Sequence, residues 1–200
     1  AVAQAVHTAA QGAGGAGIEL HTKANCSARF DWIHALGDNQ NMPRIFCIAN
    51  QKGGVGKTTT TVNLAAGLAQ LGQRVLVIDL DPQGNATMGS GVDKRSLELT
   101  VYDVLLESAT IAEARKKSES SGYDVLGANR ELAGAEVELV SVERRSERLR
   151  GALTAIENDY DFVLIDCPPA LSLLTLNGLV SAHGVIVPMQ CEYFALEGLS

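Results

Sequence analysis

Short apolar runs alternate with segments of helical spacing from residue 44 onward. We predict β-strands at the apolar runs 44–50, 74–80, 123–126, 161–166 and 184–189. We predict helices at 58–71, around 100–118 as one or two short helices, within 130–158 as one or two more, and at 171–182. Strands that are apolar at their centres are buried on both faces, which is typical of a parallel sheet.

The order of these segments predicts the fold class. Strands separated by helices require right-handed crossovers, so we expect an α/β protein with a doubly wound, mostly parallel sheet and helices on both faces. In the segment 58–71, the spacing places Leu64, Leu68 and Leu71 on one helical face. Gly72 follows as the residue that ends this helix.

The chain divides into two unequal parts. Residues 1–41 begin with a stretch rich in Ala, Gly and Gln and show no clean period, so we expect a disordered or non-native N-terminal extension, with a natural start at Met42. Residues 42–200 form the organised domain. The sequence stops at Ser200 as another helix begins, and we therefore expect this domain to continue beyond it.

Composition narrows the classes of protein. The hydrophobic fraction is 46% and the formal net charge is −7, which argues against a broadly basic nucleic-acid-binding surface. The sequence has no apolar run of the roughly 20 residues that span a bilayer. The N-terminus also lacks the basic region and apolar core of a secretory signal. We therefore expect a cytoplasmic protein with no membrane partner.

The cysteines show no spacing typical of a metal site. They are Cys26, Cys47, Cys167 and Cys191, and none belongs to a C-x-x-C pair. We predict reduced, largely buried thiols without a disulfide or metal role.

The segment Lys52-Gly53-Gly54-Val55-Gly56-Lys57-Thr58-Thr59 lies between a predicted strand and a predicted helix. Glycines allow backbone N–H groups to curve around an anion, and the helix N-terminus adds unpaired N–H groups. Lys57 supplies a charge for the β- and γ-phosphates, and the Thr58 hydroxyl is placed to bind Mg²⁺. Gln51 holds the position of the first glycine in the ordinary pattern, while Lys52 is an additional lysine.

Two further strands end in carboxylates. Asp79 and Asp81 lie at the end of the apolar run that starts at residue 74, and Asp166 ends the run that starts at residue 161. Ligands in open α/β sheets bind beyond the carboxyl ends of the strands, so we expect these aspartates to share a crevice with the glycine-rich loop. A carboxylate at position 166 can hold Mg²⁺, directly or through water, opposite Thr58.

These motifs resemble one family closely. The loop at 52–59, the segment 79–87 (DLDPQGNAT), the segment 166–169 (DCPP) and the segment 192–199 (EYFALEGL) are similar to the ParA/Soj chromosome- and plasmid-partitioning ATPases. The resemblance covers residues 42–200 and implies a P-loop NTPase of the deviant Walker A class. It implies ATP and Mg²⁺ as cofactors.

The resemblance also implies roles for single residues. Nucleotide binding falls to Gly53, Gly54, Val55, Gly56, Lys57, Thr58 and Thr59, with Thr59 at the α-phosphate. Lys57 contacts the phosphates within its own subunit, and Lys52 is the signature lysine that reaches the partner subunit's phosphates. Asp81 matches the aspartate that orients the attacking water. Thr58 and Asp166 match the magnesium site. Asp79 is expected to lie next to these ligands without binding the metal itself.

The family implies a switch with several partners. We expect an ATP-bound homodimer, non-specific DNA binding through residues that lie past Ser200, stimulation by a ParB-type centromere-binding protein, and association with the nucleoid. Two alternatives remain. One alternative is a truncated nucleotide-binding module without turnover or DNA binding. The other is a MinD-like positioning ATPase, although the second motif of that family does not read Asp-Pro-Gln-Gly-Asn as this chain does.

Overall fold

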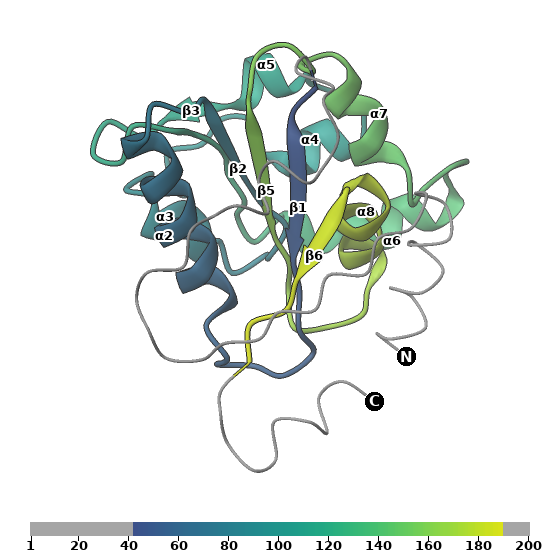
Figure 1. Ribbon diagram of the computed structural model, residues 1–200. Helices are drawn as coiled ribbons and strands as arrows, with labels where there is room; N and C mark the ends of the chain where they lie inside the picture. Colours follow the sequence, from purple (N-terminus) through teal and green to yellow (C-terminus); the bar gives the residue numbers. More distant parts are fainter. Residues whose placement is uncertain (1–41, 190–200) are drawn as a thin grey trace.

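The computed structural model describes residues 42–189, which form a three-layer α/β arrangement around one sheet (Figure 1). Within these residues the sheet has six strands in the order β3-β4-β2-β5-β1-β6. The strands are β1 Arg44–Ile48, β2 Val75–Asp79, β3 Lys116–Lys117, β4 Asp124–Leu126, β5 Phe162–Asp166 and β6 Gly184–Ile186. All neighbouring strands are parallel except β3 and β4, which are antiparallel. The predicted doubly wound, mostly parallel fold is confirmed.

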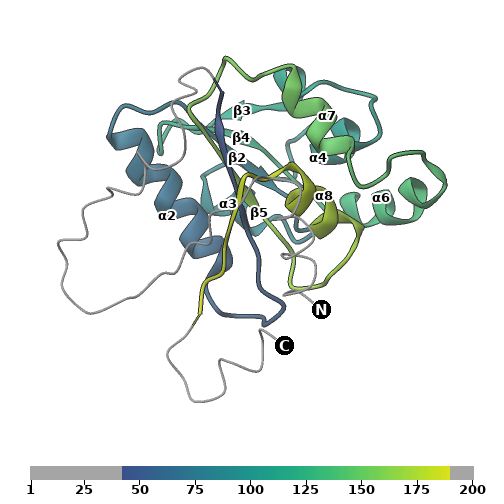
Figure 2. The same cartoon turned by 45° about the vertical axis from the view of Figure 1, so that its right-hand side comes forward.

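The helices cover both faces of the sheet, as the view turned by 45° also shows (Figure 2). They are α2 Lys57–Gln70, α3 Asn85–Gly89, α4 Val101–Leu105, α5 Ile111–Ala114, α6 Leu132–Glu138, the 3₁₀ turn η2 Leu139–Ser141, α7 Arg148–Thr154 and α8 Leu173–Ser181. Alternate strand residues supply two separate cores. Val77 and Leu164 pack with Ala65 of α2, whereas Ile78 and Ile165 belong to the opposite core.

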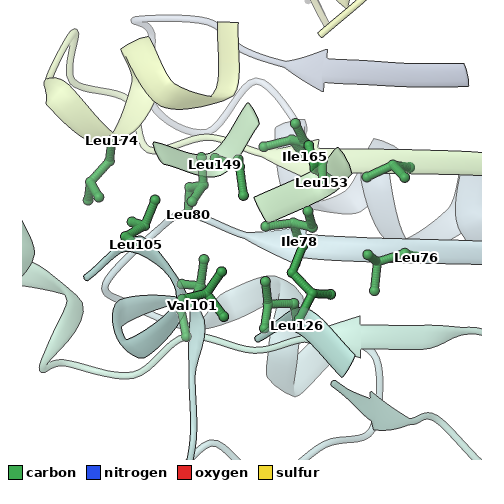
Figure 3. Close-up of a cluster of buried hydrophobic side chains, with 14 of the residues drawn as sticks. Leu76, Ile78, Leu80, Val101, Leu105, Leu126, Leu149, Leu153, Ile165 and Leu174 are labelled. Carbon is green, nitrogen blue, oxygen red and sulfur yellow. The ribbon is translucent and has the colours of Figure 1, made fainter. Parts of the chain in front are cut away.

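The larger core lies between the sheet and helices α4 to α8. Figure 3 shows side chains from several elements of this cluster converging, among them Leu76, Leu80, Leu126, Leu149 and Leu174. Each of these side chains is at most 1% exposed. At about 25 cal/mol per Å² of apolar surface, such burial is the main contribution to stability, and it holds the strand ends in fixed positions.

Two local predictions need correction, and one helix was not predicted. Lys116 and Lys117 form the antiparallel edge strand β3, although they fall in a segment predicted to be helical. Asn85–Gly89 forms the short helix α3, for which the sequence analysis predicted no element. Leu71 is 72% exposed rather than on the buried face of α2, because that face is made by Thr61, Ala65 and Leu68. Gly72 does follow the end of α2, with φ of 80°.

The remaining sequence-based expectations fall partly outside the described residues. The proposed extension at 1–41, the segment 192–199, Cys26 and Cys191 all lie outside them. Among the helices of residues 42–189, none combines the length and the apolar character that crossing a membrane requires.

Candidate functional site

The glycine-rich loop joins the end of β1 to the start of α2. Gly54 and Gly56 have left-handed φ values of 74° and 90°, a conformation that other residues adopt at a cost. Apart from the adjoining residues of the loop, no atom of residues 42–189 lies within 4 Å of where a Cβ would stand at Gly53, Gly54 or Gly56. Likewise, no side chain of the described chain caps the N-terminus of α2. The loop therefore leaves space beside its glycines, next to the positive end of a helix dipole, which suits an anion.

Lys57 is the first residue of α2 and is only 8% exposed. Its Nζ donates a hydrogen bond to the backbone carbonyl of Lys52, at 3.3 Å. Burial raises the pKa of Asp166, and the nearby charge of Lys57 partly opposes this rise, so the ammonium and this carboxylate interact electrostatically. A buried ammonium beside the open glycine loop is placed to neutralise an anion bound there.

Asp166 receives two hydroxyl groups from α2. The Thr58 Oγ1 donates to its Oδ2 at 2.7 Å, and the Thr61 Oγ1 donates to its Oδ1 at 3.1 Å. Burial raises the pKa of Asp166 to about 6, against the lowering effect of these two hydrogen bonds, while the nearby charge of Asp81 raises it further. A hydroxyl and a partly desolvated carboxylate in contact are oxygen ligands of the kind that Mg²⁺ takes.

Asp79 lies beside Asp166 in the register of β2 and β5. It is fully buried, and its carboxylate accepts hydrogen bonds from the Asp81 N–H (3.0 Å), the Thr87 N–H (2.8 Å) and the Thr87 hydroxyl (2.7 Å). The Thr87 Oγ1 in turn accepts from the Ala128 N–H at 3.0 Å. Asp79 therefore connects the loop that carries Asp81 to α3 directly, and to the segment after β4 through Thr87.

Burial raises the pKa of Asp79 to about 7, and the charge of Asp166 adds to the increase. The hydrogen bonds from Thr87 and Asp81 act in the opposite direction because they favour the ionised form. Asp81 itself is half-buried, and its Oδ1 accepts from the Gln83 N–H at 2.9 Å in a tight turn. The structure thus brings Asp79, Asp81 and Asp166 together at the C-terminal ends of the central strands β2 and β5.

The other residues of the predicted site surround this centre. Lys52 is half-buried, and its backbone N–H donates to the side chain of Asn50 at 2.9 Å. Val55 is buried at 8% exposure and anchors the middle of the loop. Thr59 is exposed in the first turn of α2, where its carbonyl accepts from the Asn63 side chain.

The sequence analysis missed three polar residues at this site. Thr61 contacts Asp166, Thr87 contacts Asp79, and Asn50 contacts the backbone of Lys52. Of these, Thr61 could have been found, because it lies three residues after Thr58 and shares its helical face. Thr87 ends the segment 79–87 quoted for the family resemblance, where it was given no role, and for Asn50 the sequence offers no comparable signal.

Two of the cysteines lie next to the site. Cys47 of β1 and Cys167, which follows Asp166, are free and buried, with their Sγ atoms 3.2 Å apart. The hydrogen bond between the two thiols and their burial raise the pKa of Cys167 well above its usual value. The expectation of buried, reduced thiols is confirmed for these two residues.

Comparison with known proteins places the chain in a family. A family model described as an AAA domain matches residues 43–200. Soj, a sporulation initiation inhibitor protein of Bacillus subtilis, is 53% identical over 159 residues, which are 80% of this chain and 63% of Soj. The chromosome partitioning protein ParA of Caulobacter vibrioides is 52% identical over 162 residues, which are 80% of this chain and 61% of ParA.

The chain belongs to the ParA/Soj family of P-loop ATPases. A solved structure from Mycobacterium smegmatis, named as a cobyrinic acid a,c-diamide synthase with bound ADP and magnesium, superposes with a TM-score of 0.76. It is 47% identical and covers 79% of this chain and 64% of its own. The chain thus spans a little over 60% of the length of the two curated relatives.

Proposed function

We propose that this chain is the nucleotide-binding part of a partition ATPase that binds ATP with Mg²⁺ and uses hydrolysis as a dimerisation switch. The observation that carries the proposal is that three elements meet at the C-terminal ends of the central strands. These elements are the glycine loop, the first turn of α2 and the end of β5. A hydrogen bond from Lys57 to the Lys52 carbonyl joins the loop to α2, and one from Thr58 to Asp166 joins α2 to β5.

The residues present fit a magnesium nucleotide. The open glycine backbone and the start of α2, from Gly53 to Thr59, would hold the phosphates, with Lys57 neutralising their charge. Thr58 and Asp166 would hold the metal ion. When bound, Mg²⁺ offsets the charge that develops on the phosphate oxygens. The relative from Mycobacterium smegmatis, with its bound ADP and magnesium, supports this assignment.

Two further residues would act on turnover. Asp81 would orient the attacking water, and Asp79 would support it by fixing the Asp81 N–H. Lys52 would place its charge against the phosphates of a second subunit, which couples dimerisation to hydrolysis. This role follows from the family resemblance and from the position of Lys52 directly before the glycines.

The biological role that we propose is segregation of a chromosome or plasmid, on a nucleoid-associated protein of the cytoplasm. It is supported by 52% identity to a protein named for chromosome partitioning. DNA and a ParB-type protein would be its partners. Because the match covers 61% of that relative, DNA binding is tested both on this chain and on a longer one.

Steady-state ATP turnover tests the proposal, measured on the full chain with and without DNA and a ParB-type protein. We expect slow turnover that requires Mg²⁺ and that rises with both partners once the chain is extended past Ser200. Lys52→Ala should bind ATP but lose the stimulated rate. If Lys52→Ala keeps both stimulated turnover and dimerisation, the switch is excluded. If the wild-type chain binds ATP without turnover in either length, it is a binding module.

A further inference from the structure

Asn50 lies at the point where β1 leaves the sheet. The backbone pairing of β1 with β6 ends nearby, with the Ala49 N–H donating to the Ile186 carbonyl at 3.1 Å. Asn50 is the next residue and is 6% exposed. Here the side chain, rather than the backbone, bonds to the segment after β6 and to the start of the glycine loop. Its Nδ2 donates to the carbonyl of Pro188 at 2.9 Å, and its Oδ1 accepts from the N–H of Lys52 at 2.9 Å.

The amide side chain makes these two bonds with two different atoms. Asparagine offers a donor and an acceptor on one short side chain, whereas aspartate at neutral pH offers acceptors alone. The bond from the N–H two residues later is an Asx turn, which fixes the direction of the chain as it enters the loop. The bond to Pro188 holds the amide group itself, so the turn is anchored to the segment that follows β6.

The loop beyond Lys52 has little rigidity of its own. Gly53 and Gly54 follow directly, and glycine restricts the backbone less than any other residue. The carbonyl of Lys52 accepts from the Lys57 ammonium, which a bound phosphate would attract. The Asn50 contact, unlike the Lys57 contact, uses no group that a bound phosphate would attract.

We infer that Asn50 is a positioning residue for Lys52, holding the peptide of this lysine against the end of β6. The effect on turnover rests on the proposed function, in which Lys52 acts on phosphates, whereas the anchorage itself does not. Asn50 should affect the rate at saturating ATP and leave nucleotide affinity almost unchanged, because the residues from Gly53 to Thr59 remain in place.

The test compares three variants of the full chain. Asn50→Ala removes both bonds, and Asn50→Asp keeps an acceptor for the Lys52 N–H but cannot donate to Pro188. Asn129→Ala is the matched control, since the Asn129 Oδ1 accepts from the Glu131 N–H at 2.9 Å in the same type of turn, after β4. Backbone amide hydrogen exchange at Lys52 and Glu131 and ATP affinity are measured on this chain. Turnover at saturating ATP is measured on the chain extended past Ser200, with DNA and a ParB-type protein present.

We expect Asn50→Ala to speed exchange at Lys52 by about tenfold or more, because the protecting acceptor is lost. Stimulated turnover at saturating ATP should fall by about tenfold, with ATP affinity within about threefold of wild type. Asn50→Asp should be intermediate in both. Asn129→Ala should speed exchange at Glu131 alone and leave turnover unchanged.

A double-mutant cycle separates positioning from a general structural effect. In a Lys52→Ala background, Asn50→Ala should lower turnover no further, because it acts through the lysine side chain. Unchanged exchange at Lys52 in Asn50→Ala would overturn the inference whatever the turnover. An equal loss of turnover in Asn129→Ala would do so as well. A wild-type chain without any turnover would instead contradict the proposed function, and exchange at Lys52 would still decide the anchorage.

Discussion

The Thr58 hydroxyl and the Asp166 carboxylate lie 2.7 Å apart, joining the first turn of α2 to the end of β5. These residues are 108 positions apart in the sequence, so only the folded sheet brings them together. Their contact makes a specific prediction about the metal dependence of nucleotide binding.

Replacing Thr58 should remove the part of ATP affinity that depends on Mg²⁺. Thr58→Val keeps the shape of the side chain but loses its hydroxyl, whereas Thr58→Ser keeps the hydroxyl. We expect chelation of Mg²⁺ to weaken ATP binding to wild type and to Thr58→Ser by about tenfold or more, since charge-assisted contacts contribute about 1.5–3 kcal/mol. Thr58→Val should bind ATP weakly with or without the metal. Equal Mg²⁺ dependence in Thr58→Val and Thr58→Ser would rule out the Thr58 ligand.

The buried Asp79 should make stability depend on pH. Its pKa is about 7 in the folded protein and 3.8 in its ordinary state. Between these values the folded chain holds a proton that the unfolded chain has lost, so the free energy of unfolding falls as pH rises from about 4 to about 7. The loss from this group is about 4 kcal/mol at most, since each pKa unit corresponds to about 1.4 kcal/mol.

Chemical denaturation at several pH values measures this slope. Asp79→Asn cannot ionise, so the difference in unfolding free energy between wild type and variant should change with pH over this window. The absolute stability of the variant is less informative, because the new amide meets the Thr87 N–H that Asp79 accepts from. Parallel stability curves for the two proteins would show that Asp79 is ionised throughout.

Two helical glycines should respond oppositely to alanine. A Cβ at Gly178 in α8 would lie 2.8 Å from the Cys167 Sγ, whereas no described atom lies within 4 Å of one at Gly67 in α2. Gly178→Ala should destabilise the fold by about 1–3 kcal/mol through overpacking. Gly67→Ala should stabilise it by about 0.5–1 kcal/mol, because alanine loses less entropy in a helix. Thermal melts of both variants check the packing of α8 behind the site; equal shifts would contradict it.

The sequence was sufficient to predict the central strands. β1, β2 and β5 lie within the predicted ranges 44–50, 74–80 and 161–166, because strands buried on both faces have continuous apolar runs. The loop at 52–59 was also predictable, since its glycines and its position between strand and helix identify it locally.

Elements that depend on distant partners were not predictable. β3 consists of two exposed lysines, which carry no strand pattern and pair only because β4 lies beside them. Asn50 gained its role from Pro188, 138 residues later, so nothing near it in the sequence indicates the contact. Side-chain hydrogen bonds across the sheet depend on tertiary structure rather than on local periodicity.

The central claim is that the loop at 52–59 binds ATP through Lys57. The most direct measurement is the ATP dissociation constant of the full chain in the presence of Mg²⁺, for wild type, Lys57→Ala and the control Lys117→Ala. Lys117 is an exposed residue of the edge strand β3. We predict that Lys57→Ala weakens binding by about 10- to 100-fold, as expected for loss of a charged hydrogen-bond donor, while Lys117→Ala binds as wild type does. Equal affinity in wild type and Lys57→Ala would contradict the account.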